Sequence, residues 1–282
     1  MTAQAKLPQD ARPVEIVVRQ PELDYRSVPK NWFNNDPFLS TLFTVFSATL
    51  PEGEKQFIHS IRHFQKQITD PVLVKEVRAF IGQEAHHAKQ HDRFNERLQE
   101  LGYDVSELQR IMSELFQLSR KNLSPEQQLA MTVCVEHFTA MMASFFLIKR
   151  PEIADQFVGA SRDIWVWHVI EEMEHKAVAF DVYEQVVNDP HHIRLRLSMV
   201  FITAMMTGRL GWHTYKVLKA NGNSRNFKSI RNGLKFVFGK GGMMSSMRRE
   251  YLDFFKRDFH PWQHDTRKEM EEWKAQYGAL FD

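Results

Sequence analysis

The sequence predicts an all-α protein built around a bundle of four long helices. Two of the predicted helices carry the tetrapeptide Glu-x-x-His, whose glutamate and histidine share one helix face. A single glutamate stands on a separate predicted helix thirty residues before the first pair, and another stands thirty-six residues before the second. The two halves of the chain therefore repeat one order of acids and imidazoles, which predicts a dinuclear metal site inside the bundle.

Residues 1–33 are predicted to be an N-terminal extension outside the bundle. Residues 1–26 are polar, contain three prolines, and lack the continuous apolar segment of a secretory signal, so we expect a cytoplasmic protein. Residues 34–50 repeat apolar side chains at helical spacing and lead into Pro51, which either kinks this helix or begins the next one. The helix that contains Glu54 is then expected to run to about residue 68.

The second ligand-bearing helix is predicted over residues 71–101. Asp70 is a favourable N-cap, Pro71 suits the first helical turn, and Gly102 follows the end of the apolar pattern. Residues 105–120 form a shorter amphipathic segment, long enough to cross between the second and third helices, as a ferritin-like bundle requires.

The third helix is predicted to open at Ser124 and Pro125 and to run to about residue 148. Residues 151–159 connect it to a fourth helix over residues 162–187, which stops before Pro190. Residues 34–190 are thus predicted to form a ferritin-like four-helix bundle.

Residues 191–282 are predicted to be a C-terminal helical region packed on the bundle. Residues 197–208 are uncharged, and this run is too short to span a bilayer, which needs about 20 residues. We expect a fifth helix that covers the bundle, with an interfacial or homodimer-forming helix as the alternative. Residues 209–257 carry twelve Lys or Arg against two acids. We expect a solvated basic face, with peripheral contact of residues 194–257 to the inner face of an anionic membrane as the alternative.

Seven side chains are predicted to bind the two metal ions. The fourth helix reads His-x-x-x-Glu-x-x-His, so His168 adds a seventh donor to a six-ligand pattern, with a packed core histidine as the alternative. His91, one turn after the second helix's pair, is expected to support the ligands from behind, with direct ligation as the alternative. The predicted ligands are Glu54, Glu84, His87, Glu136, His168, Glu172 and His175.

These residues resemble those of a known group of enzymes. The di-iron arylamine N-oxygenases have the same set, including a histidine four residues before the last Glu-x-x-His. The chain as a whole, over about residues 29–278 and including residues 50–54 and 259–262, resembles the bacterial family labelled predicted metal-dependent hydrolase, which belongs to the ferritin-like superfamily. The first likeness implies oxygenase chemistry and the second implies hydrolysis.

Four carboxylates and three imidazoles without a thiolate suit iron or manganese better than structural zinc. We expect two iron ions, with manganese or zinc as alternatives, and no catalytic residue beyond the metal ligands. Side chains one turn from the ligands are expected to form a chamber for an apolar or aromatic small molecule. These substrate-binding candidates are Phe57, Ile61, Val133, Thr139, Ala140 and Ala143.

The expected function is an O2-dependent oxygenase or oxidase, which needs an electron donor that the sequence does not identify. The alternative is metal-dependent hydrolysis, because two bound metal ions can lower the pKa of water and act as Lewis acids. Iron storage is less favoured, since the long basic C-terminal region does not suit a shell-forming oligomer. The net charge of +2 is too small to indicate nucleic acid as a partner, and the single cysteine excludes an internal disulfide.

Overall fold

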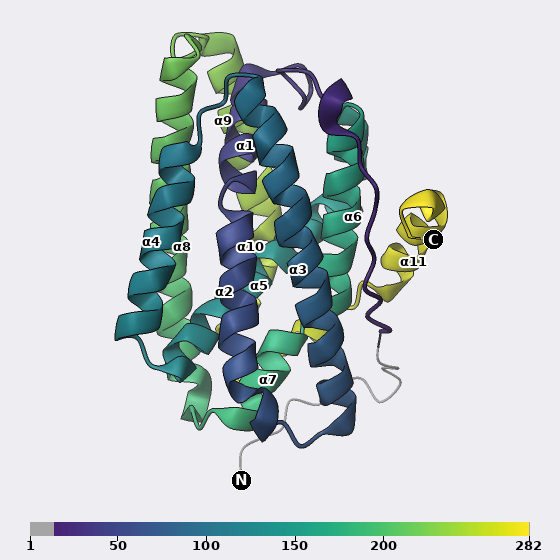
Figure 1. Ribbon diagram of the computed structural model, residues 1–282, viewed down its shortest axis with the longest axis vertical. Coiled ribbons are helices and arrows are strands. Elements are labelled where there is room, and N and C mark those ends of the chain that lie inside the picture. Colours follow the sequence, from purple (N-terminus) through teal and green to yellow (C-terminus); the bar gives the residue numbers. More distant parts are fainter. Residues whose placement is uncertain (1–13, 282) are drawn as a thin grey trace.

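The computed structural model describes residues 14–281, and this part of the chain is all-α, without any β-strand (Figure 1). An isolated bridge joins Phe33 to Phe157. The α-helices are α1 (Pro37–Ser47), α2 (Leu50–Phe64), α3 (Pro71–Glu100), α4 (Ser106–Asn122), α5 (Pro125–Ser144), α6 (Ala160–His175), α7 (Val178–Val186), α8 (Ile193–Ala220), α9 (Phe227–Phe238), α10 (Met243–Asp253) and α11 (Arg267–Gln276). Short helical turns are η1 (Tyr25–Ser27), η2 (Gln65–Gln67), η3 (Phe145–Lys149), η4 (Pro151–Gln156), η5 (Pro190–His192), η6 (Pro261–Gln263) and η7 (Gly278–Leu280).

Helices α2, α3, α5 and α6 enclose the interior in which the predicted ligands lie. Helix α2 packs against α3 and α5, and α6 packs against the same two helices. Helix α8 covers α5 and α1 from outside, and α4 lies against α2 (Figure 1). The four inner helices therefore form a closed ring around one shared space.

The helix starts follow the local sequence signals. The side chain of Asp70 accepts a hydrogen bond from the Val72 amide at 2.8 Å, and Pro71 occupies the first position of α3. Ser124 and Gln127 form a reciprocal capping box at the start of α5. Pro51 lies in the first turn of α2, where its missing N–H has no intrahelical partner to lose. Pro51 therefore begins a new helix and does not kink the preceding one.

The predicted fourth helix is not continuous, because a two-residue turn at 176–177, directly after His175, divides it into α6 and α7, although both turn residues keep right-handed helical dihedral angles. Neither proline nor glycine stands at this break. Lys176 is buried there, and its ammonium donates to the His264 carbonyl at 2.6 Å and to the Thr266 hydroxyl at 3.1 Å. The partners of Lys176 lie 88 and 90 positions away in the sequence, so no local pattern marks the break.

Helix α5 and the π-helical turn η3 that follows it are unusually apolar. Together they form a segment, Pro125–Lys149, that is long and apolar enough to cross a membrane by length and composition alone. In its most apolar window, however, 78% of the residues are buried inside the structure. The apolar surface of this segment is used to pack against the surrounding helices.

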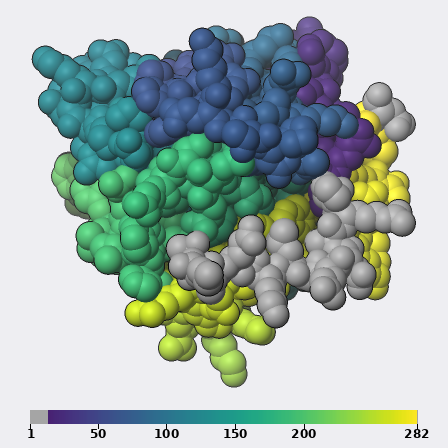
Figure 2. Space-filling view, turned by 90° about the horizontal axis from the view of Figure 1, so that it is seen from below, coloured from purple at the N-terminus to yellow at the C-terminus, as the bar shows by residue number. Residues whose placement is uncertain are grey.

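The hydrophobic core extends beyond the predicted limits of the bundle. Trp32 is fully buried and stacks on Trp165 of α6, with ring centroids 6.4 Å apart. Residues 1–13 of the predicted extension lie outside the described residues. At the other end of the chain, α10 packs on α5 and α11 packs on α6. Figure 2 views the molecule from below, where the green surface around α7 separates the blue α2–α3 connection from the yellow C-terminal segment.

Candidate metal centre

All seven predicted ligands lie in the space enclosed by the four inner helices. None of the seven is more than 2% exposed. Six of the seven, all except Glu136, belong to groups in which every pair of donor atoms lies within 4.8 Å, close enough to bind one ion. The groups made only of predicted ligands are Glu54, Glu84 and His87; His87, His168 and Glu172; and Glu84, Glu172 and His175.

Two carboxylates lie between the histidines of the two Glu-x-x-His pairs. Oε1 of Glu84 is 3.7 Å from His87 Nδ1 and 3.1 Å from His175 Nε2. Glu172 reaches the same two rings with separate oxygens, since Oε1 is 3.7 Å from His87 Nδ1 and Oε2 is 3.6 Å from His175 Nε2. Glu84 and Glu172 therefore both lie between the rings of His87 and His175.

The other two glutamates lie on opposite sides of this pair. Oε1 of Glu54 is 4.0 Å from His168 Nδ1, and Glu54 shares a donor group with His87. Oε2 of Glu136 is 3.4 Å from His175 Nε2. The donors thus divide into one half with Glu54, His87 and His168 and another half with Glu136 and His175.

Each Glu-x-x-His histidine is held from behind by a side chain outside this donor set. His87 Nε2 lies 3.0 Å from Glu171 Oε2, and because a carboxylate only accepts, the ring donates from this nitrogen. His175 Nδ1 lies 2.9 Å from Gln83 Oε1 and donates in the same way. The opposite nitrogens, His87 Nδ1 and His175 Nε2, face the enclosed space and have no hydrogen-bond partner. Burial lowers the pKa of both rings, but the bond to Glu171 and the charge of Glu84 raise that of His87, and the charge of Glu172 raises that of His175, to well above the usual range. Each inward nitrogen therefore carries a proton that a bound metal ion would displace.

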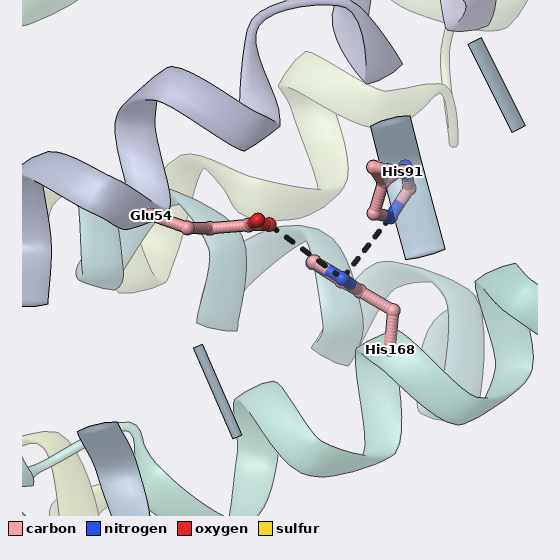
Figure 3. Close-up of side chains that lie close together, drawn as sticks. All are labelled: Glu54, His91 and His168. Atoms are coloured by element: carbon pink, nitrogen blue, oxygen red, sulfur yellow. Dashed lines mark hydrogen bonds and ion pairs between the residues drawn. The ribbon is translucent and has the colours of Figure 1, made fainter. Parts of the chain in front are cut away.

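His168 is oriented by a chain of polar side chains, of which Figure 3 shows the contact between His91 and His168. The Ser47 hydroxyl donates to Asn95 Oδ1 at 2.7 Å, so it accepts from His91 Nδ1 at 2.9 Å. His91 Nε2 is then an acceptor for His168 Nδ1 at 3.2 Å. This assignment leaves His168 Nε2 as a lone pair 3.2 Å from Glu172 Oε1.

His91 also lies within reach of a donor group with Glu54 and His168. Figure 3 shows the His168 ring between these two side chains. Because His91 and His168 face each other nitrogen to nitrogen, one of them must donate a proton to the other and cannot use that nitrogen for a metal. This geometry gives His91 a supporting position behind His168.

Three of the four predicted carboxylate ligands have no hydrogen-bond partner, whereas for Glu172 burial is outweighed by the charge of His175 and the bond to His168, which lower its pKa well below the usual range. Both oxygens of Glu54, Glu84 and Glu136 have no hydrogen-bond partner. Burial, and then the charges of Glu172 and Glu84, raise the pKa of Glu136 to about 8. Burial, reinforced by the charge of Glu84, raises the pKa of Glu54 well above its usual range. Unpaired buried carboxylates are costly, and two divalent cations would balance all four of them.

The imidazole of His168 is also disfavoured as a cation. Burial, and then the charge of the neighbouring His87, lower the pKa of His168 to about 4. A neutral ring is the form that binds a metal. The residues present therefore fit a dinuclear cation site of oxygen and nitrogen donors, a set that suits iron, manganese or zinc. The thiol of Cys134 is directed to the Leu195 carbonyl at 3.4 Å and is not part of this donor set.

A group of charged residues outside the donor set was not predicted as part of the site. Arg19 donates to both Glu171 and Glu174, and Gln83 donates to Glu174 at 2.7 Å. Glu171 and Glu174 therefore face away from the enclosed space, which leaves neither of them positioned as a general base there. Arg19 could not be found from spacing, since it lies 152 positions before Glu171.

An apolar pocket of about 860 Å³, its open mouth included, lies between α2, α4, α5 and α8. Its wall includes Gly53 and Phe57, which flank Glu54 along α2, and Val135 and Thr139, which flank Glu136 along α5. Of the six predicted substrate residues, Phe57 and Thr139 line this pocket. Ile61, Val133, Ala140 and Ala143 are buried but do not belong to its lining.

Comparison with known proteins gives one match. Neither the curated proteins nor the solved structures include a match to this chain. The model of one protein family matches residues 17–265, a range that contains all seven predicted ligands. The chain therefore belongs to the family described as predicted metal-dependent hydrolase.

Proposed function

We propose that the protein is a metal-dependent hydrolase with a dinuclear carboxylate–histidine centre in a ferritin-like four-helix bundle. The observation that best supports this proposal is that the two ring nitrogens of each histidine have different surroundings. Every outward nitrogen of His87, His168 and His175 has a hydrogen-bond partner, and every inward nitrogen lacks one. In metal-binding proteins, a hydrogen bond from the outward nitrogen orients the imidazole so that its inward nitrogen points toward the metal.

Each ligand has a distinct task in this proposal. Glu84 and Glu172 would bridge the two ions, and Glu54 and Glu136 would each bind one of them. The ions, when bound, would lower the pKa of a water molecule and polarise the bond to be cleaved. The hydrogen bonds that His87 and His175 donate to Glu171 and Gln83 hold the two rings in place, so little reorganisation is needed on loading.

The apolar pocket supports a substrate with an apolar portion. Its wall runs past Glu54 and Glu136, so a molecule bound there would lie within about one helical turn of the centre. Gln56 and Gln128 line the same pocket and are hydrogen-bonded to each other at 3.1 Å. These amides offer the polar contact that orients a bound substrate.

O2-dependent oxidation, which the sequence favoured, becomes the second candidate because the family description names hydrolysis. One observation supports this second candidate. The chain Asn95–Ser47–His91 directs a third imidazole, His168, at the centre, in agreement with the resemblance to the arylamine N-oxygenases. A reaction of this class would also require an electron donor.

The two candidates are separated by one set of measurements on the full chain. Chelated protein is reloaded under nitrogen with zinc, manganese or ferrous iron, and its metal content is determined. Each form is assayed with p-nitrophenyl esters of increasing acyl length, and oxygen uptake by the ferrous form is recorded after air is admitted.

Hydrolysis predicts metal-dependent ester cleavage that improves with acyl length and no oxygen uptake beyond that of free iron. Oxygen uptake without ester cleavage would establish the second candidate instead. His87→Ala should abolish two-ion loading, whereas His86→Ala, a half-buried neighbour on the same helix, should not. Equal metal content in both variants would contradict the proposed centre.

A further inference from the structure

The outward side of α8 is apolar along most of its length. The inward side packs against α1 and α5, and between the large outward residues lie the small exposed residues Ala204, Gly208 and Gly211. A helix that faced only water on this side would carry polar residues there. The large residues are between 49% and 68% exposed: Ile193, Leu197, Val200, Phe201, Trp212 and Tyr215.

The segment that bears this surface is strongly basic. Residues 193–242 contain ten Lys or Arg and no Asp or Glu. The whole chain has 37 basic and 35 acidic residues, so acids outnumber bases in the rest of it. The positive charge of the protein is therefore concentrated on α8, α9 and the turn between them.

Helix α9 combines apolar and basic side chains in the same way. Phe227 and Phe238 are 76% and 63% exposed, three helical turns apart on one face, and Leu234 lies on that face between them. The cations Lys228, Arg231 and Lys235 are exposed on the same helix. Ten of the sixteen exposed large apolar side chains in the described residues belong to α8, α9 and the start of α10.

The chemistry of this surface selects among the partners that could cover it. A second copy, placed by a two-fold axis on the same surface, would bring the cations of one chain against those of the other. A nucleic acid would pair with the cations but would leave the phenylalanines and Trp212 without a partner. The headgroups of an anionic bilayer accept the cations, and its acyl boundary accepts the apolar side chains.

We propose that α8 and α9 dock this protein on the surface of an anionic lipid bilayer. The inner side of α8 remains packed on α1 and α5, so the helix lies on the membrane and does not cross it. The membrane contact is independent of the reaction at the metal centre. It nevertheless brings the apolar pocket close to lipid, since Met205, Met206 and Leu210 of α8 line that pocket.

The full chain is sedimented with vesicles of phosphatidylcholine alone and with vesicles that also contain phosphatidylglycerol. Binding is expected only to the anionic vesicles and is expected to weaken in 0.5 M salt, which screens the charges. Brominated lipid should quench the emission of Trp212, and the quenching should be lost in Trp212→Phe. If the protein stays in the supernatant with anionic vesicles at low salt, the proposal is overturned.

Surface variants distinguish membrane binding from dimer formation and from binding to a nucleic acid. Phe201→Ser with Phe227→Ser, and separately Arg231→Glu with Lys235→Glu, should each weaken vesicle binding about tenfold or more. The control Val72→Ser with Leu118→Ser removes exposed apolar residues elsewhere and should bind normally. Equal binding by all three double variants would overturn the proposal. So would a dimer that the phenylalanine variant dissociates, or binding to an oligonucleotide in place of vesicles.

Discussion

Arg19 donates from both terminal guanidinium nitrogens to Glu174, with N–O distances of 2.9 and 3.0 Å, and the same group donates to Glu171 at 3.0 Å. Glu171 in turn accepts from His87, and Glu174 accepts from Gln83, the partner of His175. One arginine from the extended N-terminal segment therefore connects the supports of both Glu-x-x-His histidines.

Arg19→Ala should destabilise the protein by about 3 to 5 kcal/mol, because it leaves buried carboxylates without their main cation. Lys274 still reaches Glu174 at 2.9 Å, which places the effect toward the lower end of that range. Urea unfolding measures the change. Arg26→Ala removes only an exposed pair with Asp24 and should leave the free energy of unfolding nearly unchanged. Similar losses in the two variants would show that the Arg19 contacts are not important.

Gln83→Leu should weaken metal binding about 10- to 100-fold, since His175 loses the acceptor that orients its ring. Competition with a chromophoric chelator measures the affinity. Gln90→Leu is the matched control on the same helix, because Gln90 is buried but bonds to Tyr25 and Pro21 outside the site. The idea fails if both variants bind metal alike.

Metal content should distinguish shared from unshared carboxylates. Glu172→Gln is expected to lose both ions, because Glu172 lies between the two halves of the site. Glu54→Gln should lose one ion and keep the other. His168→Ala should leave the content nearly unchanged, since the remaining six donors are intact. Elemental analysis of the purified proteins tests all three, and a one-ion Glu172→Gln protein would contradict the bridging position.

Gly233 is required where α9 crosses α1. A Cβ at this position would lie 1.9 Å from Cδ1 of Phe38, so Gly233→Ala should cost about 1 to 2 kcal/mol despite its better helix propensity. Gly211→Ala in α8 meets no atom within 4 Å and should stabilise by about 0.5 to 1 kcal/mol. Thermal unfolding of the two variants should shift in opposite directions. A stabilised Gly233→Ala would show that α9 is not held at this contact.

Glu76 should make the protein less stable as the pH rises. Burial, and then the charges of Asp181 and Asp70, raise its pKa to about 7 in the folded protein. The folded state then holds the proton more tightly than the unfolded state, so this contribution is complete below about pH 4.5 and is lost as the pH rises through 7. Glu76→Gln should match the parent at pH 4 and exceed its stability by about 1 to 2 kcal/mol at pH 8. An equal difference at both pH values would exclude this cause.

The sequence predicted the helical class and the starts of the long helices because these depend on short-range signals such as Asp70–Pro71 and the Ser124 capping box. The seven side chains predicted as ligands are all buried, and spacing along a helix fixes the face on which each residue lies, but whether they bind metal stays a prediction. The interruption after His175 was not predictable, since the partners of Lys176 come from the C-terminal segment.

The supports of the site were harder to predict than its candidate ligands. Gln83 and Asn95 have no distinctive spacing, and Ser47 reaches His91 from a different helix. The substrate residues were chosen by their distance along a helix from a ligand, which does not show on which side of the helix a pocket opens. Phe57 and Thr139 face the pocket, whereas Ile61 and Ala143 are packed in the core.

The basic residues gather in 193–242 and acids are in excess elsewhere, so the charge is distributed unevenly along the chain. A molecule with unevenly distributed charge experiences a torque near any charged surface, at separations up to about the Debye length of 10 Å at 0.1 M salt. It would therefore rotate before touching a negative surface, and the first collision would present α8 and α9. If α8 and α9 dock on a membrane as proposed, the orientation would be set during approach and would not depend on a search after contact.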